Sequence, residues 1–222
     1  MVNEYDGPNL RVCRDCERSR DCDEHPMCPY CRGSNKAPFY PMRPSPGGDE
    51  NSGLLAAMLA SGEWVVEAKY DGERCVMSVW SDGVDCWTRH GKAMEVDAYT
   101  LARVFEMHLE GEELDGEMLR DGRYVLFDYH DNAAPYPYSQ RRRELHRETY
   151  EGGRVIEPAV VPDGMTGPEA MRWALELGDE VEGLVAKRLS SIYKTATDPK
   201  ARPSQDWVKF LPTVALVNEL EG

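Results

Sequence analysis

Apolar and polar residues alternate along much of the chain after residue 60, and alternation is the period of a half-buried β-strand. Such stretches predict strands at residues 64–69, 74–80, 84–89, 112–119, 124–129, 183–187 and 207–211. Apolar residues at helical spacing predict helices at residues 54–60, 96–109, 139–150 and 169–177. The last helix starts at a capping box, Thr166 to Glu169, and stops at Gly178. Asp-Gly turns follow the first strands, so we expect residues 64–89 to form an antiparallel meander.

The pattern changes before residue 54, and this change sets the expected domain boundaries. Residues 1–36 are polar, rich in cysteine and poor in aliphatic residues, so they need a cross-link to fold. Residues 37–53 are rich in proline and glycine and predict an extended linker. We expect the main domain at residues 54–212 and a short C-terminal stub at residues 213–222. Mostly antiparallel strands interrupted by helices predict an α+β fold.

Composition and charge narrow the class of protein. The chain has 222 residues, 41% of them hydrophobic, which suffices for one full domain and a small module. We find no signal peptide and no apolar run near about 18 residues, so we expect a soluble cytoplasmic protein with no membrane partner. A net charge of −14 disfavours general binding to DNA, because phosphate contacts come mainly from Lys and Arg. Binding would need a local basic cluster, either Arg11, Arg14, Arg18 and Arg20 or the run at 141–143.

Five of the seven cysteines lie between residues 13 and 31. Two C-x-x-C pairs enclose eleven residues, a spacing that favours a tetrahedral zinc site with four thiolates. The predicted Zn²⁺ ligands are Cys13, Cys16, Cys28 and Cys31. Cys22 and His25 lie between the pairs and are alternative ligands. Four thiolates leave no open position for catalysis, so we interpret the site as a structural clip, with a contact to DNA or a partner as the alternative.

A lysine stands at the end of an apolar strand, just before a tight turn, in the segment Lys69-Tyr70-Asp71-Gly72-Glu73-Arg74. A neutral lysine amine can attack phosphorus, but free lysine titrates near about pH 10.4 and is almost fully protonated at neutral pH. Burial, the cation Arg74 and a bound metal ion would each lower the pKa of Lys69. Gly72 lets the backbone approach a phosphate closely. By itself, the segment also fits an ordinary hairpin turn.

Four further segments follow the lysine segment in a fixed order. They are Glu113-Leu114-Asp115-Gly116-Glu117, Tyr124-Val125-Leu126-Phe127-Asp128, Glu182-Gly183-Leu184-Val185-Ala186-Lys187-Arg188 and Asp206-Trp207-Val208-Lys209-Phe210. Together the five segments resemble the nucleotidyltransferase (adenylation) domain of ATP-dependent DNA ligases, over residues 39–212. Glu73, the run from Glu182 to Tyr193 and the stretch at 204–207 are most similar to the bacterial and phage branch. The resemblance implies an ATP-grasp-like domain of two antiparallel sheets flanked by helices, with ATP between them, behind the small zinc-binding module.

The resemblance also implies a role for each site residue. Lys69 would attack the α-phosphorus of ATP and carry AMP, which then passes to the 5′-phosphate of nicked double-stranded DNA. The implied catalytic residues are Lys69, Arg74, Lys187 and Lys209. The implied nucleotide-binding residues are Glu67, Lys69, Arg74, Arg89, Phe127, Glu182, Lys187 and Lys209. Phe127 would stack on adenine, Glu67 would lie in the adenine pocket, and Lys187 and Lys209 would face the phosphates.

The implied metal ligands for Mg²⁺ (or Mn²⁺) are the carboxylates of Glu117 and Glu182, since such ions bind one or two carboxylates together with phosphate oxygens. Three nucleotide-binding assignments have simpler alternatives. Glu67 could face solvent on its strand, Arg89 could belong to a charged turn, and Phe127 could be a core residue. We expect Cys75 and Cys86 to be core residues.

Several features depart from the ligase pattern or leave alternatives open. Leu211 stands where ligases usually carry a second lysine two residues after Lys209. Ligases continue beyond the position of Gly222 into an oligonucleotide-binding (OB) fold domain, so we expect that domain in trans, in a longer chain, or lost with slow AMP transfer. Arg141 follows Tyr138-Ser139-Gln140, as in related ligases, and an internal brace is the alternative to its DNA contact. The alternative functions are an RNA ligase, an mRNA-capping-type nucleotidyltransferase and a non-catalytic nucleotide-dependent DNA adaptor.

Overall fold

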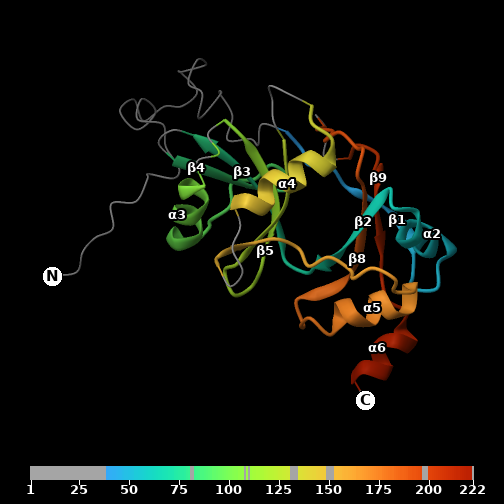
Figure 1. The fold of residues 1–222 in the computed structure, drawn as a ribbon. Coiled ribbons are helices and arrows are strands. Elements are labelled where there is room, and N and C mark those ends of the chain that lie inside the picture. The colour runs from blue at the N-terminus through green and yellow to red at the C-terminus, as the bar shows by residue number, and fades with distance from the viewer. Residues whose placement is uncertain are drawn as a thin grey trace, which may run out of the picture.

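The computed structural model describes residues 39–80, 83–107, 109, 111–130, 135–148, 153–196 and 200–221. Within these ranges the chain forms two β-sheets flanked by helices, which confirms the α+β class (Figure 1). The predicted zinc module and its ligands Cys13, Cys16, Cys28 and Cys31 lie outside the described residues, so the zinc site stays a prediction. Within the part of the chain that is described, no helix has the length and apolar character needed to cross a membrane.

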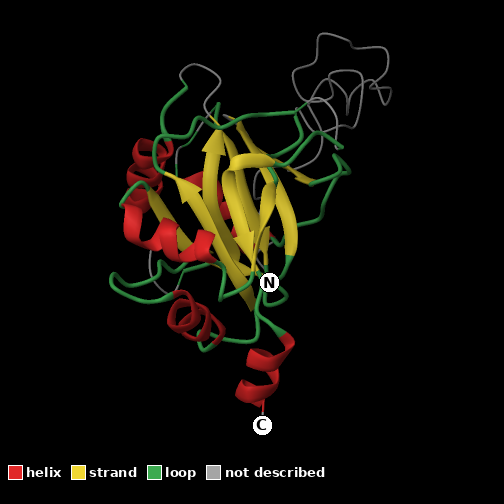
Figure 2. Cartoon of the chain, turned by 90° about the vertical axis from the view of Figure 1, so that its right-hand side faces the viewer, coloured by secondary structure: helices red, strands yellow, loops and turns green. Residues whose placement is uncertain are grey.

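One sheet has four strands in the order β1-β9-β8-β2. These strands are β1 (Pro44–Gly48), β9 (Ser204–Phe210), β8 (Val181–Arg188) and β2 (Trp64–Tyr70). Helix α2 (Gly53–Ser61) packs on β2 and helix α5 (Gly167–Leu175) packs on β8, while Leu216 of helix α6 (Val214–Glu221) joins the same apolar core. Seen from the side, α6 extends beyond the end of the strands (Figure 2).

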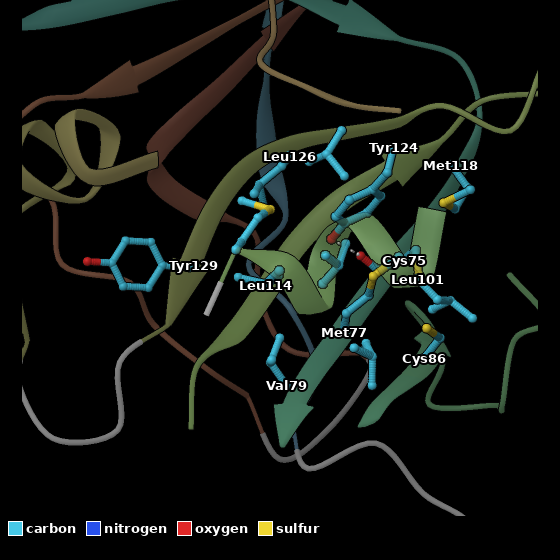
Figure 3. Close-up of a cluster of buried hydrophobic side chains, with 14 of the residues drawn as sticks. Cys75, Met77, Val79, Cys86, Leu101, Leu114, Met118, Tyr124, Leu126 and Tyr129 are labelled. Carbon is cyan, nitrogen blue, oxygen red and sulfur yellow. Dashed lines mark hydrogen bonds between the residues drawn. The ribbon is translucent and has the colours of Figure 1, made fainter. Parts of the chain in front are cut away.

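The second sheet has five strands in the order β4-β3-β5-β6-β7. These strands are β4 (Gly83–Thr88), β3 (Glu73–Trp80), β5 (Glu113–Met118), β6 (Tyr124–His130) and β7 (Val155–Ile156). Helix α3 (Ala98–Glu106) packs near β4, and helix α4 (Tyr138–Glu148) packs on β6. A core of buried side chains, drawn in Figure 3, lies between this sheet and α3. Cys75 and Cys86 are buried in it, as predicted.

The predicted meander is wrong at its first turn. β2 pairs with β8 in one sheet, whereas β3 pairs with β4 and β5 in the other, so the Asp71-Gly72 turn carries the chain from one sheet to the other. A Cβ atom at Gly72 would lie 2.3 Å from the backbone oxygen of Met118, so this crossing needs glycine. The sheets are also mixed, and not wholly antiparallel as expected, because β1 runs parallel to β9 and β7 runs parallel to β6.

The segment predicted as a linker belongs to the domain from Phe39 onward. Phe39 and Met42 are buried, and β1 pairs with β9. Pro44 and Pro46 lack a backbone N–H group, which is tolerated on an edge strand such as β1. The C-terminal stub is also structured, since it forms α6. Proline content therefore marked an edge strand here and not a free linker.

A third group of buried residues joins the two sheets. Phe39, Met42, Val76, Tyr193 and Trp207 pack together, with Phe127 against them. The strands that carry Lys69 and Glu117 are therefore held at a fixed spacing by apolar contact as well as by the chain crossing at residues 71–72.

Candidate active site

A cavity of about 860 Å³ lies between the two sheets and collects most of the residues that the sequence singled out. Its walls come from β1, β2, β8 and β9 on one side and from β3, β5 and β6 on the other. The predicted site residues that line it are Glu67, Lys69, Arg74, Arg89, Glu117, Phe127, Lys187 and Lys209. Glu182 completes the set through a direct contact with Lys69. Residues far apart in the sequence thus meet at one place.

The pairing of three strands explains how Lys69 gains its neighbours. Glu67 and Lys69 lie two residues apart on β2 and so point to the same face of the sheet. Lys69 pairs with Gly183 on β8, and Val185, two residues further on, pairs with Lys209 on β9. The close approach of strands at Gly183 excludes a side chain, because a Cβ atom there would lie 2.4 Å from the Phe210 oxygen.

The environment of Lys69 lowers the pKa of its amine relative to that of a free lysine. The side chain is only 23% exposed and forms an ion pair with Glu182. Burial lowers the pKa of Lys69, and the cations Lys209 and Arg74 lower it further, against the opposing charge of Glu117. The predicted depression of this pKa by burial and a neighbouring cation is therefore present in the structure.

Two carboxylates reach Lys69 from opposite sheets. Glu182 belongs to β8, while Glu117 belongs to β5 and pairs with Arg74 on β3. Burial raises the pKa of Glu117, although Arg74 and Lys69 favour its charged form. A Mg²⁺ ion in a nucleotide site takes only one or two carboxylates from the protein, while phosphate oxygens and water supply its other ligands. The two carboxylates match that number. Among the described residues, no group of three or more potential metal-binding side chains gathers.

Arg74 is held rigidly by a buried carboxylate that the sequence reasoning assigned no role. Its Nε and Nη2 atoms lie 2.5 and 2.6 Å from the two carboxylate oxygens of Asp115, and Nη2 also donates to the Met42 oxygen. Tyr193 donates to Asp115 at 2.6 Å. Burial works against the charge of Arg74, but Asp115 outweighs it and raises the pKa of the guanidinium. The guanidinium lies 4.6 Å above the Phe127 ring.

Lys187 lies against Glu67, which differs from the prediction that it would face the phosphates. Its Nζ atom is 2.8 Å from Glu67 Oε2 and donates to the Phe127 backbone oxygen at 2.8 Å. The side chain is nearly fully buried, and Nζ lies within 4.8 Å of the ring centres of Phe127, Tyr138 and Trp207. Glu67 is buried too, so its solvent-facing alternative is wrong.

The basic run at 141–143 has an internal role. Arg141 is 1% exposed and forms two hydrogen bonds with the buried Asp128, at 2.6 and 2.9 Å. Arg142 lies 3.5 Å from Glu67, and Arg143 is exposed. Arg141 therefore braces α4 against β6, as the internal-brace alternative predicts. Arg89, by contrast, is exposed at the cavity.

Comparisons with known proteins agree with this geometry. No protein-family model matches the chain. A DNA ligase from Thermococcus fumicolans is 26% identical over 212 residues, which cover 78% of this chain and 37% of that protein. The chain thus spans well under half the length of this relative.

The fold is that of solved DNA ligases. The mycobacterial DNA ligase D complexed with ATP and MES is similar with a TM-score of 0.57 and 22% identity, over 78% of this chain and 60% of that one. The ATP-dependent DNA ligase from bacteriophage T7 in complex with ATP is similar with a TM-score of 0.53 and 13% identity, over 74% and 67%. The described domain therefore has the nucleotidyltransferase fold of these ligases.

Proposed function

We propose that this chain is the nucleotidyltransferase part of an ATP-dependent DNA ligase and that Lys69 carries AMP covalently during nick sealing. The observation that supports the proposal best is the setting of Lys69. Its partly buried amine has a lowered pKa, contacts Glu182, and shares one cavity with Glu117, Lys209 and the ring of Phe127. Similarity to ligases in sequence and fold supports the same reaction class.

In the first step, the neutral Nζ of Lys69 attacks the α-phosphorus of ATP. A P–N bond forms, the bond from the α-phosphorus to the bridging oxygen breaks, and pyrophosphate leaves with the electron pair. The ammonium must first lose a proton, and Glu182 is hydrogen-bonded to it and so placed to accept that proton. Lys209 lies on β9, which β8 separates from the strand of Lys69, and its cation balances the charge that develops on the phosphate.

Glu117 and Glu182 would hold the divalent ion, Mg²⁺ or Mn²⁺. When bound, such an ion neutralises negative charge on the phosphates. Glu182 is also the ion-pair partner of Lys69, so the same carboxylate would serve both the amine and the ion.

In the second step, an oxygen of the 5′-phosphate at the nick attacks the phosphorus of the lysyl adduct. The P–N bond breaks and Lys69 recovers a proton. The 3′-hydroxyl group then attacks the activated 5′-phosphate and displaces AMP, which joins the strands. Arg89 is exposed at the cavity, and its guanidinium suits the incoming 5′-phosphate.

Incubation with ATP labelled at the α-phosphate, followed by denaturing gel electrophoresis, tests the proposal. We expect a labelled wild-type band that requires Mg²⁺ or Mn²⁺ and that is absent in Lys69→Ala. Lys92→Ala is the matched control, because Lys92 is exposed and is not among the residues that line the cavity. A wild-type band that persists in Lys69→Ala would refute the mechanism.

Substrate identity is tested by exchanging the nucleotide and the nick. We expect joining of a nicked DNA duplex with ATP, alone or with an OB-fold polypeptide added. Preference for GTP would indicate a capping-type enzyme, and preference for an RNA nick would indicate an RNA ligase. Leu211 stands where ligases usually carry a second phosphate-binding lysine, so that contact is missing. The residue lies beside Gly183, the strand partner of Lys69. Binding of ATP or DNA with no covalent AMP would identify a non-catalytic adaptor.

The N-terminal cysteines are proposed to bind one zinc ion as a structural clip. Metal analysis of the purified chain should find one equivalent of zinc that is lost when Cys13 and Cys16 are replaced by serine. The absence of zinc in the wild-type protein would contradict this part of the proposal.

A further inference from the structure

Behind the cavity, Tyr138 of α4 is hydrogen-bonded to the carboxylate of Glu67. Its hydroxyl group donates to Glu67 Oε1 at 2.5 Å, and Lys187 Nζ lies 2.8 Å from the other oxygen, Oε2. Arg142 lies 3.5 Å from Oε1. Burial and the charge of Glu67 raise the pKa of Tyr138 well above its ordinary value, so the hydroxyl remains a donor. Tyr138 does not line the cavity, but Glu67 does.

The same hydroxyl oxygen completes the hydrogen bonds of Lys187. An ammonium group has three N–H donors. The three acceptors near Nζ are Glu67 Oε2 at 2.8 Å, the Phe127 backbone oxygen at 2.8 Å and the Tyr138 oxygen at 3.2 Å. Lys187 therefore has no N–H group left for a ligand, and the only polar function that this network offers to the cavity is the carboxylate of Glu67, which accepts hydrogen bonds.

This carboxylate and the aromatic ring of Phe127 line the same cavity. Phe127 and Glu67 both line the cavity, and Lys187 contacts both of them. A base bound in the cavity beside Phe127 would turn an edge toward Glu67, while Lys69 lies two residues further along β2 on the same face. An amino group on that edge would donate to the carboxylate. A carbonyl group on that edge would meet a second acceptor and would be repelled.

We propose that Tyr138 is a positioning residue for base selection: it orients Glu67 as an acceptor and occupies the third N–H of Lys187, so that the cavity takes a 6-aminopurine and rejects a 6-oxopurine. This inference rests on the proposed nucleotidyl transfer. It assigns a role in that reaction to a residue that does not line the cavity.

Tyr138→Phe should relax this selection in a specific way. The variant removes one donor to Glu67 and one acceptor of Lys187, while it keeps the aromatic ring. One N–H of Lys187 then becomes free to donate to a 6-oxo group. ATP should react less well and inosine triphosphate (ITP), which carries a carbonyl in place of the 6-amino group, should react better. A general loss of structure would lower both rates and leave their ratio unchanged.

The experiment measures covalent adduct formation with ATP and with ITP, each labelled at the α-phosphate, in the 222-residue chain. We expect the wild-type ratio of the second-order rate constants for adduct formation, ATP over ITP, to fall by about tenfold or more in Tyr138→Phe, because a hydrogen bond to a charged group is involved. Tyr124→Phe is the matched control, since Tyr124 is a fully buried tyrosine whose hydroxyl donates to the Cys75 backbone oxygen in the core of Figure 3. Its ratio should equal that of the wild type.

An unchanged ratio in Tyr138→Phe would overturn the inference, even if both rates fall. If Tyr138→Phe shows no cooperative unfolding transition, Glu67→Gln replaces it, since the glutamine amide can donate to a 6-oxo group and should also lower the ratio. If the wild type forms no adduct with either nucleotide, the proposed function fails. Calorimetric dissociation constants for ATP and ITP then decide the inference, and an equal preference in wild type and Tyr138→Phe contradicts it.

Discussion

The reactivity of Lys69 depends on the balance between neighbours that lower its pKa and neighbours that raise it. Burial, Lys209 and Arg74 lower the pKa, and Glu117 raises it. A lysine with a lowered pKa reaches its neutral form at a lower pH than a free lysine does. The rate of adduct formation should therefore rise with pH as Lys69 loses its proton and then level off.

Lys209→Met should move the rising limb of this pH–rate profile to higher pH. The substitution removes a cation that lowers the pKa of Lys69, so deprotonation then needs a higher pH. The measurement is single-turnover adduct formation across the pH range, with Lys92→Met as the control for loss of an exposed lysine. A limb that stays in place or moves to lower pH would show that Lys209 does not act on Lys69.

The residues whose roles could not be predicted from the sequence are those that act through another side chain. Lys69, Glu117 and Phe127 stand in recognisable segments, and the structure brings them together. Asp115 and Tyr138 lie within quoted segments too, yet their partners Arg74 and Glu67 are 41 and 71 residues away. Hydrogen bonds of this kind follow from strand pairing and from the packing of α4 against the sheets, which residue patterns do not reveal.

At the scale of elements, the crossing between β2 and β3 positions the lysine. Gly72→Ala should destabilise the domain by about 1 to 3 kcal/mol and slow adduct formation, because the new Cβ atom would lie 2.3 Å from the Met118 oxygen and force the turn to shift. Urea unfolding and the adduct assay measure the two effects. Gly53→Ala at the start of α2 is the control, since its Cβ atom would meet nothing within 4 Å. Equal stability of the two variants would contradict a tight crossing.

The brace between α4 and β6 gives a second prediction at this scale. Arg141→Ala should lower the free energy of unfolding by about 3 to 5 kcal/mol, because it leaves the buried Asp128 without its cation. Arg143→Ala, on the exposed side of the same helix, should change it by less than about 0.5 kcal/mol. Denaturant titration of both variants checks the difference. A loss of DNA affinity in Arg141→Ala without a loss of stability would favour the DNA-binding role instead.

Strand positions were predictable because alternation of apolar and polar residues marks them directly, and the strands expected between residues 64 and 129 are present. The partners of the strands were not predictable. The Asp71-Gly72 turn has the composition of a hairpin turn, although it crosses between sheets. β1 was missed because its prolines indicate a loop. β7 was missed because a strand of two residues is too short to show an alternating pattern. The mixed character of both sheets comes from these two strands.

At the scale of the whole molecule, the cavity draws its lining from both sheets. A nucleotide bound there should therefore stabilise the entire domain. ATP at about 100 times its dissociation constant should raise the free energy of unfolding by about 2.7 kcal/mol. Thermal unfolding followed by near-ultraviolet circular dichroism tests this, with inorganic triphosphate as the control ligand without a base. The absence of any shift at saturating ATP would contradict a nucleotide site between the sheets.

Mapping of the covalent adduct tests the central claim most directly. The protein is incubated with ATP and Mg²⁺, digested under conditions that preserve P–N bonds, and sequenced by tandem mass spectrometry. The structure predicts AMP on Lys69, with Lys187 and Lys209 unmodified. AMP on a different residue, or no AMP on a folded protein that binds ATP, would contradict the assignment of Lys69 as the nucleophile.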